Sequence, residues 1–135
     1  MYLYVFGNGN LSWEDFLAHY YQQMIFLDLE LTHFIVCDFR GVDTLVMEYL
    51  KCKTDQVNIY HIGSLPRYLP DKYKTKVSNW ILCGGYETDE ERDNAAIEMC
   101  THFLARDFNS TNERKSGTQR NIEKCLALGK EGLTL

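Results

Sequence analysis

Residues 114–122 combine side chains whose types and spacing suit the binding of an anion. Ser116 stands where a helix N-cap belongs and Gln119 follows three residues later, so the two can form a capping box. A helix start leaves backbone N–H groups without intrahelical partners, and the helix dipole makes that end positive. Gly117 has no Cβ to keep a ligand away from the backbone. The stretch therefore predicts either a phosphate site or a well-capped turn without a ligand.

Three charged residues elsewhere in the chain could share such a site. Asp43 falls in the first turn of a predicted helix, where an acid either complements the helix dipole or accepts hydrogen bonds from a sugar hydroxyl. Arg92 and Asp93 fall in the first or second turn of another predicted helix. An adjacent pair of opposite charges there is either a solvated surface feature or part of a ligand cleft. The sequence leaves both alternatives open at each place.

The cysteines and histidines show no spacing typical of a metal site. The five cysteines are odd in number and contain no Cys-x-x-Cys pair, and the four histidines have no zinc spacing with them. We therefore expect no metal and no cofactor. The net charge of −5 argues against binding to duplex nucleic acid, which requires clustered positive charge.

The bulk composition is that of an ordinary globular protein. With 135 residues, of which 45% are hydrophobic, the chain can form one domain over residues 1–135 with its own core. No segment approaches the ~20 apolar residues of a membrane span, and the N-terminus lacks the pattern of a secretory signal. We therefore expect a cytoplasmic protein without a membrane partner. The aromatic content of 13% favours a homodimer or a higher homo-oligomer.

Apolar runs alternate with helical patterns along the chain. The runs predict strands at residues 1–6, 31–37, 57–62, 80–83 and 102–105, with a final short strand at 133–135. Capping signals at Ser12, Thr88 and Ser116 and an apolar stripe after Gly41 predict four helices between them. Residues 64–78 contain both prolines and no helical stripe, so they predict a long loop that is a lid, an interface or a tolerated insertion.

The alternation predicts an α/β domain with a mainly parallel sheet of about five strands. In such sheets a ligand binds beyond the carboxyl ends of the strands, where the strand order reverses. Four loops are expected to converge on one cleft there: residues 7–10, 38–43, 84–93 and 107–118.

The order of these motifs resembles the SLOG superfamily of Rossmann-like nucleotide-binding proteins. That group includes the Lonely Guy phosphoribohydrolases, the DprA-like proteins and the YpsA-like proteins, and the nucleoside deoxyribosyltransferases are similar in outline. The resemblance rests on the first strand with its glycine loop, Arg40-Gly41-Val42-Asp43-Thr44-Leu45 with Glu48, Glu91-Arg92-Asp93, and Ser116-Gly117-Thr118 with Asn121-Ile122 and Gly129-Lys130. It covers most of the chain, apart from the long loop and the first helix.

The resemblance implies a Rossmann-like three-layer sandwich, a homo-oligomer, and a nucleotide or nucleotide-derived ligand. It implies that Ser116, Gly117 and Thr118 hold a phosphate, that Asp43 and Arg92 line the same cleft, and that the glycine loop forms its floor. The ligand-binding residues expected on this basis are Gly7, Asn8, Gly9, Arg40, Gly41, Asp43, Arg92, Ser116, Gly117, Thr118 and Asn121.

One residue departs from the pattern of the enzymes in the superfamily. In the hydrolases and transferases a catalytic glutamate follows the threonine by three residues, whereas here that position is Asn121. An amide is neither a nucleophile nor a general base near neutral pH. By motif position Glu48 and Asp93 are the best candidates to replace it, with Asp43 and Asp107 behind them.

The sequence is compatible with three functions. The first is a binding or sensing module for a nucleotide or nucleotide-like signal. The alternative is an N-glycosidic hydrolase or transferase that acts on a nucleoside monophosphate. A protein-interaction domain that keeps the fold without the ligand is the third.

Overall fold

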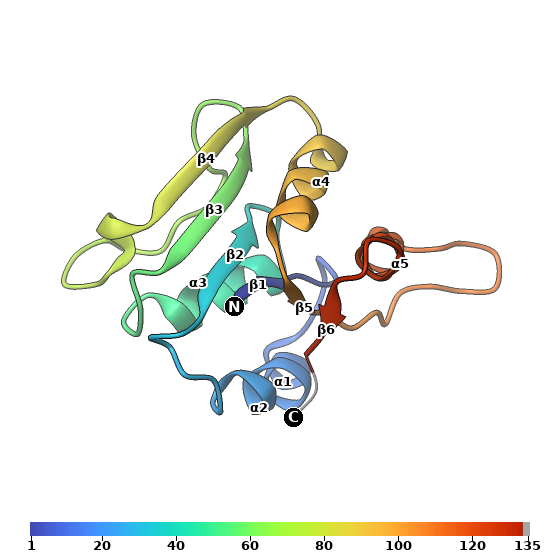
Figure 1. The fold of residues 1–135 in the computed structure, drawn as a ribbon, viewed down its shortest axis with the longest axis horizontal. Helices are drawn as coiled ribbons and strands as arrows, with labels where there is room; N and C mark the ends of the chain where they lie inside the picture. The colour runs from blue at the N-terminus through green and yellow to red at the C-terminus, as the bar shows by residue number, and fades with distance from the viewer. Residues whose placement is uncertain (134–135) are drawn as a thin grey trace.

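The computed structural model describes residues 1–133 as a parallel sheet between two layers of helices (Figure 1). The elements in chain order are β1 (Tyr2–Val5), α1 (Trp13–Phe16), η1 (Leu17–Tyr21), α2 (Gln22–Met24), β2 (His33–Cys37), α3 (Val42–Leu50), β3 (Val57–Ile62), η2 (Val77–Asn79), β4 (Ile81–Tyr86), α4 (Asp89–Met99), β5 (His102–Leu104), α5 (Gly117–Ala127) and β6 (Glu131–Gly132). The six strands are all parallel, in the order β4-β3-β2-β1-β5-β6. The predicted Rossmann-like α/β class is confirmed, with six strands rather than about five.

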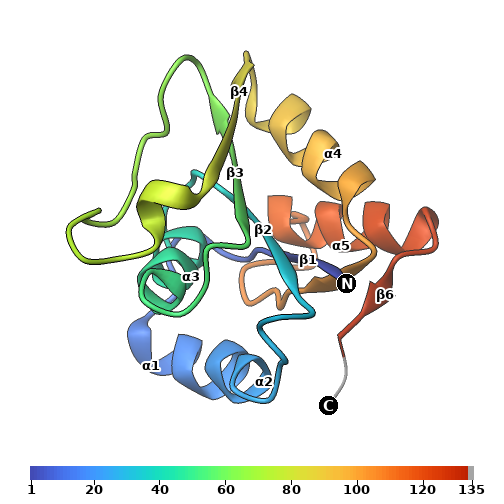
Figure 2. The ribbon, with the colours of Figure 1, turned by 60° about the vertical axis from the view of Figure 1, so that its left-hand side comes forward.

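Each face of the sheet has its own apolar core, because successive side chains of a strand point to opposite faces. Leu3 and Val5 of β1 pack with the helices α1, α2 and α3, whereas Tyr4 packs on the other face with α4 and α5. Figure 2 separates the two helical layers: α1, α2 and α3 lie on one side of the strands, and α4 and α5 lie on the other. This is the three-layer sandwich.

The strand order reverses at β1. The chain proceeds from β1 outward through β2, β3 and β4, and it then crosses back to place β5 on the other side of β1. Loops that leave the carboxyl ends of β1 and β2 therefore diverge from the loop that leaves β5. This is the place where a parallel α/β sheet accommodates a ligand.

The first predicted helix is interrupted by a π-helical turn. Ser12 caps α1 by accepting the N–H of Asp15 at 3.1 Å, as the sequence predicts. The helical path continues through the π turn η1 into α2, and Phe16, Tyr20 and Met24 are buried along it. Tyr20 uses its hydroxyl to donate to the carbonyl of Phe6 at 2.8 Å, which ties this helix to the end of β1.

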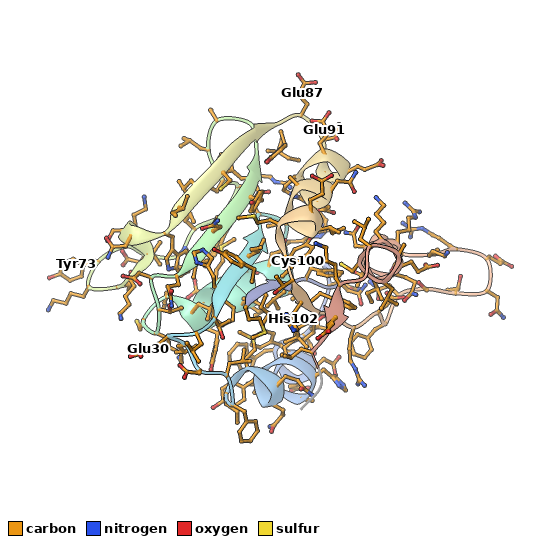
Figure 3. The ribbon with its side chains drawn as sticks, in the orientation of Figure 1. Glu30, Tyr73, Glu87, Glu91, Cys100 and His102 are labelled. Atoms are coloured by element: carbon orange, nitrogen blue, oxygen red, sulfur yellow. The ribbon has the colours of Figure 1, made fainter. Side chains whose placement is uncertain are left out.

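The crossover from β3 to β4 contains no α-helix, as predicted for residues 64–78. Its outer tip carries the exposed side chain of Tyr73 (Figure 3), while Val77 and Trp80 pack into the core under α3. The indole N–H of Trp80 donates to the carbonyl of Thr54 at 2.9 Å. These contacts anchor the second half of the crossover, and the backbone N–H of Arg67 anchors its first half to Asp38.

Strand β4 extends beyond its predicted end at residue 83. The sequence places Gly84 and Gly85 in the expected loop at residues 84–93, but they lie inside β4, where the ladder with β3 has a register shift between Tyr60 and Ile62. A Cβ on Gly84 would collide with the ring of His61, and Gly85 has a φ of +91°. Both glycines are therefore explained by the irregular pairing of β4 with β3, and neither lines the cleft.

The last strand lies earlier than predicted. The sequence predicted it at residues 133–135, whereas β6 is Glu131–Gly132, and Leu133 donates its N–H to the carbonyl of Phe103 at 2.8 Å. Thr134 and Leu135 fall outside the described residues. Within residues 1–133, no helix combines the length and the apolar character that crossing a membrane requires.

Candidate functional site

A cleft of about 410 Å³ lies where the strand order reverses. The loops after β1, β2 and β5 line it, together with the first turns of α3, α4 and α5. The predicted residues that line it are Gly7, Asn8, Gly9, Arg40, Asp43, Arg92, Asp93, Ser116, Gly117, Thr118 and Asn121. The structure therefore brings together residues from all four predicted loops.

The start of α5 forms one wall of the cleft. Ser116 has the extended backbone of an N-cap, and its Oγ accepts the N–H of Gln119 at 3.0 Å. The reciprocal half of the predicted capping box is absent within residues 1–133, because the N–H of Ser116 donates to Ser110 Oγ instead. The first intrahelical bond runs from Arg120 to Ser116, so the helix offers no acceptor to the N–H groups of Gly117 and Thr118.

Open space lies in front of this helix start. A Cβ added to Gly117 would meet no atom within 4 Å, and the backbone φ there is not positive. The side chains of Ser116 and Thr118 are already engaged, since Ser116 Oγ donates to Asp107 at 2.7 Å and Thr118 Oγ1 accepts from Asn8 at 3.2 Å. The two backbone N–H groups are therefore the donors that this end of α5 presents.

Asn8 is a structural hub rather than a free ligand-binding amide. Its Nδ2 donates to Asp107 and Thr118, and its Oδ1 accepts the N–H of Phe108 at 2.8 Å. These bonds join the loop after β1 to the loop after β5. Burial raises the pKa of Asp107, but hydrogen bonds from Ser110, Ser116 and Asn8 outweigh it, and the pKa of Asp107 falls well below its usual range.

The glycines of the first loop are required by packing. A Cβ on Gly7 would collide with Tyr20 and Val42, and a Cβ on Gly9 would lie 2.6 Å from the ring of Phe39. Gly41 is not among the residues that line the cleft, and its backbone presses against Asn8 and Gly9 with a φ of +72°. The reason for glycine at 41 is this close approach of two chain segments.

A cluster of ion pairs centred on the buried Arg92 forms the floor beside α4. Arg92 is only 3% exposed, and its guanidinium pairs with Asp38 at 2.8 Å, Asp89 at 2.9 Å and Asp93 at 3.0 Å. Arg67, from the long crossover, adds a second guanidinium to Asp38 and Asp89. Burial raises the pKa of Asp38, but the hydrogen bonds and charge of Arg67 and Arg92 outweigh it, and the pKa is lowered.

Asp43 faces the cleft from the first turn of α3, where the sequence places it. Its Oδ2 accepts the N–H of Phe39 at 2.9 Å, and only 5% of the residue's surface is exposed. Burial is the main cause that raises the pKa of Asp43 to about 7, against the hydrogen bond from Phe39 and the charge of Arg92. Near neutral pH this carboxyl therefore exists in both protonation states.

Asn121 and Asp93 are in direct contact. The amide Nδ2 of Asn121 donates to Asp93 Oδ2 at 2.9 Å, and both residues line the cleft. Glu48, the other candidate acid, is not among the residues that line the cleft. Glu48 pairs with Lys51 at 2.7 Å and accepts from Tyr68. It follows Asp43 by five residues on α3, and a rotation of about 100° per residue turns it away from the cleft.

The residues that the prediction missed come from loops and from the sheet itself. Tyr4 of β1 and Arg114, in the stretch before α5, line the cleft, and Asp38, directly after β2, pairs with Arg92 beside it. Arg67 lies 29 residues from Asp38 in sequence, so no local pattern could pair them. The only feature of the sequence that pointed to Asp38 is its position directly after the apolar run at residues 31–37.

No family model, curated protein or solved structure compared with the chain matches it. Among the described residues, no group of three or more His, Cys, Asp and Glu side chains is arranged to hold a metal ion. The chemistry of the cleft therefore has to be inferred from its own geometry.

Proposed function

We propose that the protein binds a nucleotide or nucleotide-derived ligand in this cleft, as a binding or sensing module. The ligand's phosphate occupies the space in front of α5, where it accepts hydrogen bonds from the N–H groups of Gly117 and Thr118. The observation that carries the proposal is the combination of that open space with two backbone donors at the positive end of an 11-residue helix.

The remaining contacts support a ligand longer than a phosphate. The cleft continues from Gly117 past Asn121 to Asp43, whose carboxyl can accept from a sugar hydroxyl or, when protonated, donate to the ligand. A volume of about 410 Å³ is within the range of small-molecule sites. The ion pairs of Arg92 with three aspartates hold the floor in place without a ligand.

The space in front of Gly117 can be filled without disturbing the fold, which gives a direct test. We expect Gly117→Val to retain the wild-type melting temperature but to lose the rise in melting temperature that nucleotides cause in the wild-type protein. Ala127→Val, which places the same valine side chain at the exposed far end of α5, is the matched control and keeps the ligand response. An equal response in Gly117→Val and wild type, or no response of the wild type to millimolar nucleotides, contradicts the proposal.

The alternative is an N-glycosidic hydrolase or transferase acting on a nucleoside monophosphate, and the contact of Asp93 with Asn121 favours it. The contact brings a carboxylate next to the position at which the SLOG hydrolases and transferases, which the sequence resembles, carry their glutamate. Asp93 is also bonded to Arg92, which lowers its availability as a nucleophile or base. We therefore favour binding without turnover.

Release of free base from nucleoside monophosphates, followed by chromatography, separates the two functions. If the protein is an enzyme, Asp93→Asn abolishes the release, whereas Glu48→Gln, which changes a carboxylate outside the cleft, leaves it intact. If no base appears from any common ribonucleotide or deoxyribonucleotide while the thermal response persists, the protein binds without turnover.

A further inference from the structure

The arginines of the chain divide into two groups by their hydrogen bonds. Of the six arginines, four have acceptors: Arg67 and Arg92 pair with aspartates, Arg106 contacts His19, and Arg120 donates to the carbonyl of Lys115. Within residues 1–133, the guanidinium groups of Arg40 and Arg114 have neither an ion pair nor a hydrogen bond. Both of these side chains line the same cleft.

Arg40 enters the cleft from the loop between β2 and α3. Its guanidinium lies 5.3 Å from the centre of the Phe39 ring, and its Cγ and Nε lie 3.2 Å from the position that a Cβ on Gly9 would take. The side chain is thus folded back over the loop after β1. This position leaves its N–H donors available at the mouth of the cleft.

Arg114 enters from the opposite wall, two residues before the N-cap of α5. Its backbone is fixed by two bonds to Thr111: the N–H of Arg114 donates to Thr111 Oγ1 at 3.1 Å, and the N–H of Thr111 donates to the carbonyl of Arg114 at 2.8 Å. The loop that carries it is further tied to Ser116 through Ser110. A guanidinium without an acceptor therefore projects from a loop with an ordered backbone.

Neither of these two arginines forms an ion pair with a carboxylate of residues 1–133. The three aspartates of the floor are paired with Arg92 and Arg67, and Asp107 accepts from neutral donors of its own loops. A single phosphate in front of Gly117 would have its hydrogen-bond donors at the start of α5, in the N–H groups of Gly117 and Thr118. Within residues 1–133, the two guanidinium groups at the mouth then have no ion-pair partner, although guanidinium forks are suited to bidentate bonds with phosphate oxygens.

We infer that the ligand carries a second phosphate, as in a nucleoside diphosphate, and that Arg40 and Arg114 bind this second phosphate. The inference rests on the proposed function, because it takes the first phosphate to lie at Gly117. It assigns to the two arginines the discrimination between a monophosphate and a diphosphate ligand.

Titration calorimetry in buffer without divalent cations tests the inference with two sets of probes. The first set is phosphate against pyrophosphate, which needs no knowledge of the base. The second set is the mono- and diphosphates of adenosine, guanosine, cytidine and uridine. We expect the wild-type protein to bind pyrophosphate and at least one diphosphate about tenfold more tightly than the matching monophosphate.

Arg40→Gln and Arg114→Gln each should remove most of that preference and leave the affinity for the monophosphate within about twofold. Both side chains are exposed and without polar partners in residues 1–133, so the variants should keep the wild-type melting temperature. Arg120→Gln removes an exposed arginine outside the cleft and is the matched control; it retains the preference.

The outcomes distinguish this inference from the proposed function. Equal binding of mono- and diphosphates by the wild type overturns the inference and leaves the proposed function in place. An equal loss of both affinities in Arg40→Gln and Arg114→Gln also overturns it, because the arginines would then contact the first phosphate. If the wild type binds none of the probes, the proposed function fails and the inference fails with it.

Discussion

Asp43 is a carboxyl group whose environment differs strongly from that of a free side chain. It is 95% buried at the start of α3, with one backbone donor for its two oxygens, and its pKa is raised to about 7. A carboxyl whose pKa lies near 7 can accept a hydrogen bond from a ligand when it is ionised, and it can donate one when it is protonated. The same burial costs folding free energy whenever the group is ionised.

The first prediction concerns the pH dependence of that cost. The folded protein binds the Asp43 proton more tightly than the unfolded chain, so stability falls as pH rises from about 4 to about 7. Asp43→Asn keeps an acceptor for Phe39 and cannot ionise. Its stability relative to wild type should rise by about 2 to 3 kcal/mol between about pH 5 and about pH 8, measured by urea denaturation. Parallel pH profiles of the two proteins would contradict the raised pKa.

The second prediction concerns the arginine at the centre of the ion pairs. Arg92→Met leaves Asp38 and Asp93 without their buried cation, and the free energy of unfolding should fall by about 3 to 5 kcal/mol. Arg67 contacts the same Asp38, but about half of its side chain is exposed, so Arg67→Met should cost less than about 1 kcal/mol. Urea denaturation measures both free energies of unfolding. Similar losses in the two variants would contradict the claim that the burial of Arg92 makes its ion pairs more important for stability.

At the scale of elements, the cleft depends on how closely the loop after β1 approaches the start of α3. Gly41 has a φ of +72° and lies against the backbone of Asn8 and Gly9, and the N–H of Val42 donates to the carbonyl of Asn8 at 3.3 Å. The start of α5 differs, because Gly117 has space before it and an ordinary backbone. One glycine therefore serves packing, and the other leaves room for a ligand.

The third prediction follows from that contrast. Gly41→Ala should lower the free energy of unfolding by about 2 kcal/mol or more, through left-handed backbone strain and a clash with the neighbouring loop. Gly117→Ala should leave stability unchanged or raise it slightly, since alanine favours a helix more than glycine does. Chemical denaturation of both variants checks this pair, and equal effects would mean that the two glycines do not differ in the way described.

At the scale of the whole molecule, β4 ends the sheet with an uncovered edge. Residues 80–86 carry no charge, and Ile81 and Leu82 of β4 are 54% and 40% exposed. A neutral, apolar edge strand is a template for pairing with another chain. The homo-oligomer expected from the sequence remains a prediction, as does the cytoplasmic location, and this edge is the surface on which we expect the oligomer to form.

The fourth prediction tests that surface. We expect wild-type protein to sediment as a dimer or larger species and Ile81→Lys to sediment as a monomer, because a lysine on an edge strand opposes strand pairing. Phe26→Lys, which changes an even more exposed apolar residue far from β4, is the control and should leave the assembly unchanged. A monomeric wild-type protein would contradict both the expectation and the assigned surface.

The features that the sequence determined by itself are those that depend on near neighbours in the chain. The caps at Ser12, Thr88 and Ser116 each form the predicted bond to the third residue that follows, and the apolar runs form the strands. Glu87 and Glu91, which point outward at the start of α4 (Figure 3), add a further local bond at 3.1 Å. Local geometry suffices for such contacts because only a few dihedral angles separate the partners.

Tertiary structure alone decided which side chains meet. Arg92 and Asp38 are 54 residues apart, and Asn8 and Asp107 are 99 residues apart, yet both pairs form bonds that shape the cleft. The packing of α3 and α4 against the sheet likewise determines that Asp93 lies in the cleft beside Asn121, whereas Glu48 pairs with Lys51 outside it. Such contacts depend on strand order and on the burial that follows from it, and no short-range pattern in the sequence encodes either.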